Sequence, residues 1–215
     1  YNGMISPLVP YTIRGAIWYQ GESNRDDGYT YETKMRALIA GWRALWKKEA
    51  LPFYFVQLAP YRYGGDEELL AQIWEAQSKT LAVPHTGMAV TVDISNITDI
   101  HPRNKQDVGK RLALWALAKT YGQAALVYSG PLYESMQVEG DKIRIHLNHI
   151  GSGLKSRDGK PLSWFTIAGS DKQFVDATAE IDGNTVLVAA DTVKDPVAVR
   201  FGGHQEAEPN LSNQE

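Results

Sequence analysis

Two short polar loops carry the residues that are best suited to chemistry. The first loop, residues 20–24, reads Gln-Gly-Glu-Ser-Asn and offers amide, carboxylate and hydroxyl groups beside a glycine that lets backbone N–H groups approach a ligand closely. The second loop contains Asp99 and His101. Histidine has an unperturbed pKa of about 6.5, so His101 can act as a general base at neutral pH, and a nearby carboxylate would fix its tautomer. These residue types predict a ligand-binding loop and an acid–base group.

The carboxylate that would orient this histidine has two candidates, Asp99 and Asp93. An Asp-x-His sequence ahead of a helix is also typical of a loop that merely caps the helix, and the spacing leaves both interpretations open. Ser23 could serve as a nucleophile if it had an adjacent base and an oxyanion hole. Its surroundings lack the G-x-S-x-G pattern, however, and a serine in this position is more typical of a helix cap or a hydrogen-bonding residue.

The other histidines do not indicate a metal site. His146 and His149 are three residues apart on a predicted strand, so they should point to opposite faces. His85 follows a proline in a predicted turn, and His204 lies in a polar C-terminal segment. The chain has no H-E-x-x-H motif and no cysteine, and we therefore expect neither a metal ion nor another cofactor.

Aromatic residues are frequent enough to raise the question of a sugar-stacking surface. Four tryptophans fall at apolar positions of predicted helices and are expected in the core: Trp42, Trp46, Trp74 and Trp115. Tyr61 and Tyr63, which flank Arg62 in a loop, are better candidates for a wall of the substrate site. Ordinary loop packing would explain the two tyrosines equally well.

The elements that must position these loops alternate between strand and helix in the first half of the chain. Apolar runs predict strands at 15–19, 53–58 and 87–92, and apolar residues spaced by three and four predict helices at 31–46, at 66–81 and from about 105 to 122. This alternation predicts an α/β fold, in which a parallel sheet with right-handed crossovers carries helices on its faces. Ligands bind at the carboxyl ends of such strands, where both polar loops lie.

Beyond residue 122 the pattern changes to short apolar runs separated by turn residues. Runs around 136–138 and 143–145, and around 179–181 and 186–188, flank glycine-containing turns that favour β-hairpins. We therefore expect a partial α/β domain over residues 1–124, a β-rich module over 125–203 and a polar tail over 204–215. A sheet of three strands is thin for an α/β domain.

Composition excludes several functional classes. With 22 basic and 25 acidic residues the net charge is −3, which lacks the electrostatic footprint of a nucleic-acid-binding protein. No apolar stretch approaches the roughly 20 residues that a membrane span requires. We expect neither nucleic acid nor membrane as a partner.

Three segments together resemble the sialate O-acetylesterase family of the SGNH hydrolase superfamily. They are Tyr-Asn-Gly-Met-Ile at residues 1–5, Arg-Gly-Ala-Ile-Trp-Tyr-Gln-Gly-Glu-Ser-Asn at 14–24, and Asp-Ile-His-Pro-Arg-Asn-Lys-Gln-Asp-Val-Gly at 99–109. The β-rich half resembles the family's later segment. The resemblance implies part of a doubly wound, flavodoxin-like, three-layer fold and an esterase that removes acetyl groups from carbohydrates, classically O-acetylated sialic acids, with some relatives acting on acetylated plant polysaccharides.

The resemblance also assigns roles to individual residues. His101 matches the general base and Asp99 the residue that orients it, although the superfamily usually places this aspartate three residues before the histidine, where Thr98 stands here. The resemblance places the oxyanion or substrate site at the family block containing Gln20, Gly21, Glu22 and Asn24. Which of these four donates hydrogen bonds to the oxyanion remains open.

The family's nucleophilic serine lies in a G-Q-S-N-M motif, which these 215 residues do not contain. We therefore expect the chain to be an N-terminally truncated esterase, inactive by itself, whose partner is the missing segment of the same protein. A glycan substrate would place the intact protein in the periplasm, outside the cell or in a lysosome. The alternatives are an esterase of acetylated xylan or another glycan, and a non-catalytic carbohydrate-binding relative.

Overall fold

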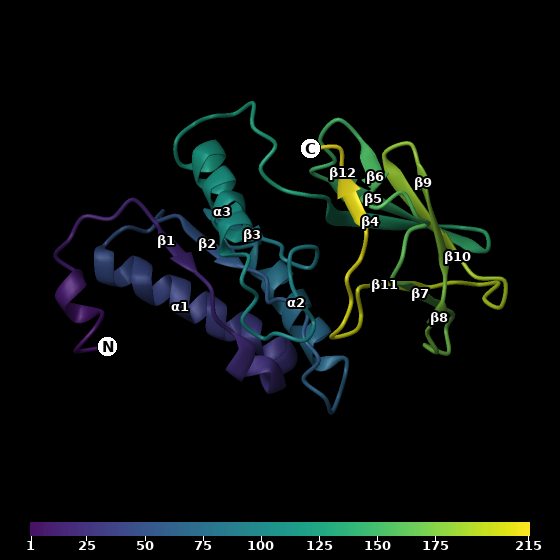
Figure 1. Cartoon of the computed structure of the whole chain (residues 1–215), viewed down its shortest axis with the longest axis horizontal. Helices are drawn as coiled ribbons and strands as arrows, with labels where there is room; N and C mark the ends of the chain where they lie inside the picture. The colour runs from purple at the N-terminus through teal and green to yellow at the C-terminus, as the bar shows by residue number, and fades with distance from the viewer. The chain divides into compact units, whose positions relative to one another are not determined.

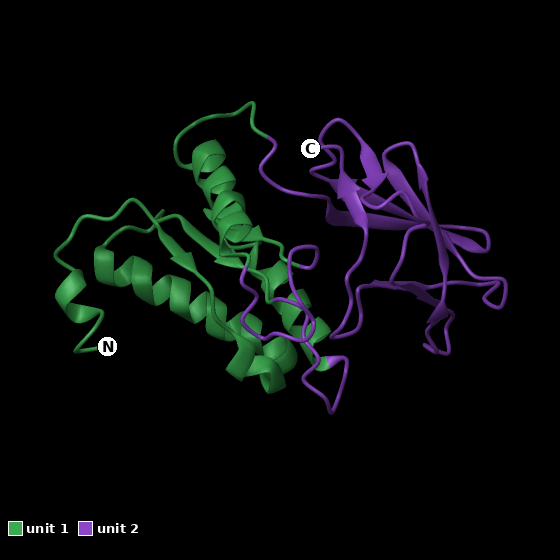
Figure 2. Ribbon diagram, viewed as in Figure 1, with its two compact units in different colours: residues 1–58, 69–91, 104–126 green, residues 59–68, 92–103, 127–215 purple.

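The computed structural model describes all residues from Tyr1 to Glu215 and divides them into two compact units. Figure 2 shows the first unit, residues 1–58, 69–91 and 104–126, and the second, residues 59–68, 92–103 and 127–215. The first unit contains the α/β elements and the second contains the antiparallel strands. The boundaries differ from the expected linear division because two loops, 59–68 and 92–103, group with the C-terminal strands.

The first unit is built on a parallel sheet in the order β1-β2-β3. Its elements in chain order are η1 (Ser6–Leu8), β1 (Ala16–Trp18), η2 (Glu22–Thr30), α1 (Tyr31–Trp46), β2 (Phe53–Val56), α2 (Leu69–Thr80), β3 (Thr86–Ala89) and α3 (Lys105–Lys119). The α/β prediction and its three strand–helix pairs are confirmed. Helix α2 begins at Leu69 rather than at 66 because the Asp66 Oδ1 accepts a hydrogen bond from the Glu68 N–H (2.9 Å) and forms a turn there.

Helices pack on both faces of this sheet, as Figure 1 shows for α1 and α3. On one face, the Trp42 ring of α1 lies 6.3 Å from Trp18 of β1 and 6.0 Å from Phe53 of β2. On the other face, Trp115 of α3 packs directly over Gly87 of β3, where any Cβ would collide with the indole. These contacts give the three-layer arrangement expected of the fold.

The predicted tryptophan core is confirmed for two of the four residues. Trp74 and Trp115 are buried, whereas Trp42 and Trp46 are only half-buried and stack on each other with ring centroids 5.2 Å apart. The Trp46 indole N–H donates to the carbonyl of Tyr11 (3.0 Å). These two rings therefore lie at the partly exposed margin of the core rather than at its buried centre.

The second unit consists of antiparallel strands in two sheets and one additional strand pair. The sheets have the orders β4-β5-β10-β9 and β11-β7-β8, and β12 pairs with β6. The strands are β4 (Leu132–Glu139), β5 (Lys142–Asn148), β6 (Leu154–Ser156), β7 (Phe165–Ala168), β8 (Val175–Asp176), β9 (Thr178–Asp182), β10 (Thr185–Ala189), β11 (Ala198–Phe201) and β12 (Leu211–Asn213). Both predicted hairpins are present as β4–β5 and β9–β10.

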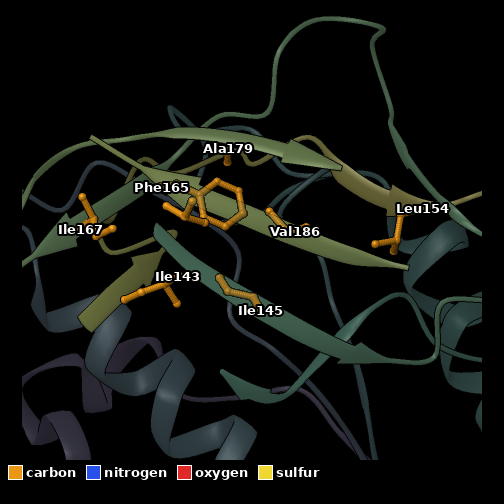
Figure 3. Packing of buried hydrophobic residues seen from close by; sticks show 8 residues of the cluster. Ile143, Ile145, Leu154, Phe165, Ile167, Ala179 and Val186 are labelled. Carbon is orange, nitrogen blue, oxygen red and sulfur yellow. The ribbon is translucent and has the colours of Figure 1, made fainter. Parts of the chain in front are cut away.

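The core of the second unit lies between these strands. Figure 3 shows the buried side chains that alternate along the strands, which are Ile143, Ile145, Leu154, Phe165, Ile167, Ala179, Val186 and Val188. Each of these side chains except that of Ala179 contributes about 1.5 to 3 kcal/mol when it is fully removed from water. The two-residue period in β5 and β10 thus becomes one apolar face directed inward.

The segment 204–215 is part of the fold and not simply a polar tail. Strand β12 pairs with β6, and Asn210 is only 3% exposed. The Asn210 Nδ2 donates to Ser156 Oγ (3.1 Å), Asp158 Oδ1 (2.9 Å) and the Pro161 carbonyl (3.0 Å), and its Oδ1 accepts from the Ser163 N–H (3.0 Å). The polar composition of the segment suggested an exposed tail. Composition alone does not reveal that polar side chains such as Asn210 have hydrogen-bond partners inside the molecule.

Replacing Asn210 with alanine should lower the free energy of unfolding of this chain by roughly 1 to 3 kcal/mol, because the hydrogen bonds of a buried amide to partly buried and exposed groups would be lost. Urea unfolding measures this change. Asn148 is exposed and makes no side-chain hydrogen bond, so Asn148→Ala should stay within about 0.5 kcal/mol of the original protein. An equal loss in the two variants would contradict the assigned role of Asn210.

The same substitution should change the titration of Asp158. The hydrogen bond from Asn210, followed by that from the Lys160 N–H, lowers the pKa of Asp158 from its ordinary 3.8 to about 2. A lowered pKa stabilises the fold above the ordinary value, and this stabilisation disappears as the pH falls from about 4 to about 2. Asn210→Ala should raise the pKa of Asp158 measured by NMR, and its destabilising effect should shrink over this pH range.

Candidate functional site

The first predicted site loop leaves the end of strand β1 in a conformation that requires glycine. Gly21 has φ 148° and ψ −8°, and a Cβ at this position would lie 2.9 Å from the Tyr31 hydroxyl oxygen. That hydroxyl donates a hydrogen bond of 2.8 Å to the Gln20 carbonyl. Burial raises the pKa of Tyr31 to about 12, so the phenol remains protonated and able to donate at neutral pH. Helix α1 thereby holds the backbone of the loop.

A chain of side-chain hydrogen bonds fixes the two amides of this loop. The Gln20 Nε2 donates to Asn24 Oδ1 (2.7 Å), and the Asn24 Nδ2 donates to Asp27 Oδ2 (2.6 Å). The same Asp27 oxygen accepts from Lys34 Nζ at 2.6 Å. Lys34, and after it Asn24, lowers the pKa of Asp27, which therefore stays ionised at neutral pH. The order of these bonds sets the orientation of both amides.

The hydrogen bonds also distinguish the four predicted oxyanion residues. The Gly21 N–H already donates to Glu22 Oε2 (3.1 Å), so the Glu22 carboxylate serves as an acceptor within the loop. Gln20 and Asn24 each use one amide hydrogen within the loop, and each NH₂ group carries a second. The two amides are therefore the side chains of this block with N–H donors left for a ligand.

The second predicted site loop follows strand β3 and contains His101. The Asp99 N–H donates to the Asn96 carbonyl (3.0 Å), and Asp99 Oδ1 accepts from the His101 backbone N–H (2.9 Å). Pro102 is buried, whereas the His101 side chain is exposed and its imidazole makes no hydrogen bond or ion pair. The loop thus has a fixed backbone and an accessible imidazole.

Asp99 contacts the backbone of His101 and not its imidazole. This contact forms an Asx turn, so Asp99 does not cap helix α3 as the alternative interpretation of the Asp-x-His sequence expected. Helix α3 itself begins with another cap, since Asn104 Oδ1 accepts from the Asp107 N–H (3.2 Å). The choice between Asp99 and Asp93 as the residue that orients the imidazole stays a prediction.

Residues 20–24 and residues 99–101 belong to different compact units, and within each unit the predicted residues come together. Sequence reasoning missed Tyr31, Asp27 and Lys34, which support the first loop. Tyr31 and Lys34 looked like ordinary positions of an amphipathic helix. The only available signal was the density of polar residues between Gln20 and Gly28, which shows that hydrogen bonds must form but not which ones.

Ser23 differs from its expected role. It is exposed, and its hydroxyl makes no hydrogen bond, so it acts as neither a helix cap nor a hydrogen-bonding residue. Residue Gly21 occupies the N-cap position of η2 without a side-chain cap. Tyr61 and Tyr63 form an edge-to-face pair with centroids 4.8 Å apart, which satisfies ordinary loop packing.

No group of three or more His, Asp or Glu side chains lies close enough together to hold a metal ion. His149 lies one residue beyond strand β5 and packs against the Tyr128 ring, with centroids 5.1 Å apart. No helix combines the length and the apolar character that crossing a membrane requires.

The model of a carbohydrate esterase family, described as sialic acid-specific acetylesterase, matches residues 3–118, more than half of the chain. The chain belongs to this carbohydrate esterase family. The matched range includes both predicted site loops. The sequence resemblance to sialate O-acetylesterases is therefore confirmed at the level of the family.

Known relatives of this chain are longer than the chain. The sialate O-acetylesterase of Rattus norvegicus is 37% identical in an alignment 157 positions long, which covers 64% of this chain and 29% of the rat protein. The human sialate O-acetylesterase is 33% identical in an alignment 168 positions long, which covers 69% of this chain and 32% of the human protein. The chain thus spans about a third of these curated relatives.

A solved structure resembles this chain along its whole length. It is a carbohydrate acetylesterase from Xanthomonas citri, with a TM-score of 0.96 and 46% sequence identity. The match covers 100% of this chain and 50% of the solved one. The partial three-layer α/β fold followed by antiparallel strands is therefore confirmed.

Gly21→Ala should lower the free energy of unfolding by about 1 to 3 kcal/mol, because alanine strongly disfavours this backbone conformation. The added Cβ would also displace the Tyr31 hydroxyl. The matched control is Gly41→Ala in helix α1, where a Cβ meets nothing within 4 Å. The control should stabilise the chain by about 0.5 to 1 kcal/mol. Urea unfolding would refute the role of Gly21 if both variants shifted in the same direction.

Proposed function

We propose that this chain supplies the acid–base and oxyanion half of a carbohydrate O-acetylesterase that acts on O-acetylated sialic acids. The observation that carries the proposal is the family match over residues 3–118, since it includes both the Gln20 loop and His101. The amide hydrogens of Gln20 and Asn24 and the exposed imidazole of His101 support these assignments.

In the proposed reaction, a serine hydroxyl attacks the acetyl carbonyl while His101 takes the proton from the serine. The amides of Gln20 and Asn24 stabilise the negative charge on the carbonyl oxygen of the tetrahedral intermediate. His101 then protonates the departing sugar oxygen, which leaves an acetyl-serine, and water activated by the same imidazole releases acetate. Asp99 or Asp93 orients His101 in this scheme.

The nucleophilic serine is proposed to lie in an upstream segment of the same protein. Support comes from strand β1, which pairs with β2 on one side and forms an edge of the sheet on the other. Ile17 in this strand shares a face with Tyr54, which α3 covers, yet Ile17 itself is 69% exposed. A further strand and helix of the same domain would cover this apolar residue.

The alternative substrate is acetylated xylan or another glycan. It is favoured by the higher identity, 46% against 37%, to a structure described only as a carbohydrate acetylesterase. Comparing kcat/KM for O-acetylated sialic acid with kcat/KM for acetylated xylan decides between the two substrates.

The proposal is tested by comparing the chain alone with a version extended upstream through the serine motif, using 4-nitrophenyl acetate and O-acetylated sialic acid. Activity in the extended protein alone supports the proposal. A high rate from the chain alone that is lost on Ser23→Ala would make Ser23 the nucleophile. Inactivity of both proteins with retained sugar binding would favour a non-catalytic carbohydrate-binding role.

His101→Ala in the extended protein should lower kcat by about 10²- to 10⁴-fold, the usual contribution of a general acid–base group. The thermal unfolding midpoint should change little because the imidazole makes no hydrogen bond or ion pair. His85 is exposed and has φ 60°, a conformation that asparagine tolerates, so His85→Asn is a suitable control with unchanged kcat. A loss below about tenfold for His101→Ala would exclude it as the base.

A further inference from the structure

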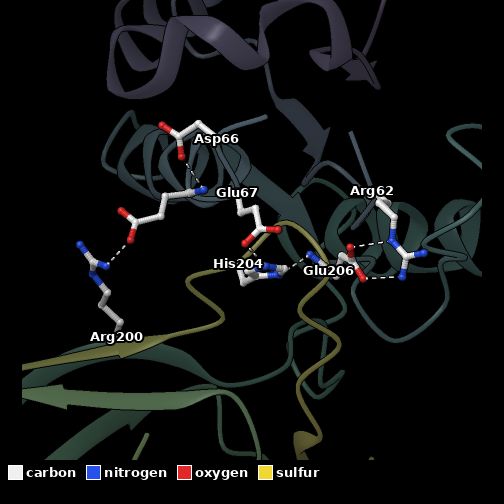
Figure 4. Close-up of polar contacts among 7 residues, drawn as sticks. Arg62, Asp66, Glu67, Arg200, His204 and Glu206 are labelled. Carbon is white, nitrogen blue, oxygen red and sulfur yellow. Dashed lines mark hydrogen bonds and ion pairs between the residues drawn. The ribbon is translucent and has the colours of Figure 1, made fainter. Parts of the chain in front are cut away.

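The loop 59–68, which follows strand β2, is joined to the segment 200–206 by three side-chain pairs within the second unit. Figure 4 shows these contacts. The pairs are Arg62–Glu206 (2.7 Å), Glu67–His204 (2.9 Å) and Glu68–Arg200 (2.8 Å). Two of the three are ion pairs between an arginine and a carboxylate, and all three join the loop to the segment.

Backbone hydrogen bonds join the same two segments. The Tyr61 N–H donates to the Gln205 carbonyl (3.0 Å), and the Gln205 N–H donates to the Glu67 carbonyl (2.9 Å). Gln205 is 1% exposed, so these bonds are shielded from water. The C-terminal segment therefore forms a support for the loop.

Arg62 extends this support to the loop that contains His101. Its backbone N–H donates to the Ile97 carbonyl (3.0 Å). The neighbouring Asn96 carbonyl accepts from the Asp99 N–H (3.0 Å), and the Asp99 carboxylate accepts from the His101 N–H (2.9 Å). A continuous path of contacts runs from Glu206 through Arg62 to His101.

The Arg62–Glu206 pair is bidentate, and this geometry fixes the orientation of the two side chains relative to each other. Arg62 Nε and Nη2 donate to the two Glu206 oxygens at 2.7 and 2.8 Å, a bidentate arrangement, whereas Arg200–Glu68 and His204–Glu67 have one contact each. The Arg62 guanidinium lowers the pKa of Glu206, so the pair is fully charged at neutral pH.

We propose that Arg62 and Glu206 are positioning residues for His101, so that the segment after strand β11 holds the catalytic loop in its productive place. This inference rests on the proposed role of His101 as general base. In this proposal the antiparallel part of the chain contributes to catalysis by holding the His101 loop, without contacting the substrate. A catalytic group displaced by about 1 Å can lose roughly 100-fold in rate, so a modest shift of this loop is measurable.

The test uses the upstream-extended protein with 4-nitrophenyl acetate as substrate. Glu206→Ala should lower kcat by about tenfold, within the range for a misplaced catalytic group, and leave KM unchanged. Exchanging the two charges in the double variant Arg62→Glu, Glu206→Arg should restore most of kcat, because the backbone bond from residue 62 to Ile97 does not depend on the side chain. Combined with His101→Ala, Glu206→Ala should cause no further loss.

Glu68→Gln is the matched control because it removes an ion pair between the same two segments that has no link to Ile97. The control should leave kcat unchanged.

Three results would overturn the inference. They are an equal loss of kcat in Glu68→Gln, a loss of kcat that follows the thermal unfolding midpoint across the variants, and an additive loss in the His101→Ala background. If Glu206→Ala kept a normal kcat while His101→Ala lost most of its kcat, the inference would be overturned and the assignment of His101 as the base would stand. A normal kcat for His101→Ala would remove the proposed function and the inference together.

Discussion

The buried carboxyl end of strand β2 is the constraint on which the α/β part of the chain depends. All four residues of Phe53–Val56 are buried, so the backbone groups where the strand ends must find partners inside the protein. Helix α2 supplies them: Gln77 Nε2 donates to the Val56 carbonyl, Gln77 Oε1 accepts from the Leu58 N–H, and the Trp74 indole donates to the Leu58 carbonyl. Gln77 is 1% exposed, and a polar residue this deep is tolerated because both ends of its amide are used.

The two candidate loops, one in each unit, are held by different kinds of interaction. The Gln20 loop depends on a glycine conformation, a buried tyrosine hydroxyl and a chain of short hydrogen bonds that ends at Lys34. The His101 loop depends on backbone hydrogen bonds and on the Asp99 carboxylate, which accepts from the His101 N–H. Both arrangements fix the backbone and leave the functional groups accessible, as catalysis by preorganised donors and an accessible base requires.

Local patterns were sufficient to predict most of the α/β elements and both hairpins. The helix 31–46 could be predicted because its apolar residues repeat every three or four positions along one face, and the observed helix is Tyr31–Trp46. The start of helix α2 could not, since the side chain of Asp66 forms a turn that competes with the helix. The segment 204–215 was also misjudged because a buried asparagine such as Asn210 resembles an exposed one in composition.

The sequence by itself determined the family, the alternation of strands and helices and the identity of the candidate residues, because these depend on residue types and on short-range periodicity. Only the tertiary structure decided which groups meet: that Asp99 contacts the backbone of His101, that the Gly21 N–H is already occupied, and that Arg62 joins Glu206 to the His101 loop. The partners in the last case are 144 residues apart. Such pairings follow from the packing of the whole unit, and no local pattern encodes them.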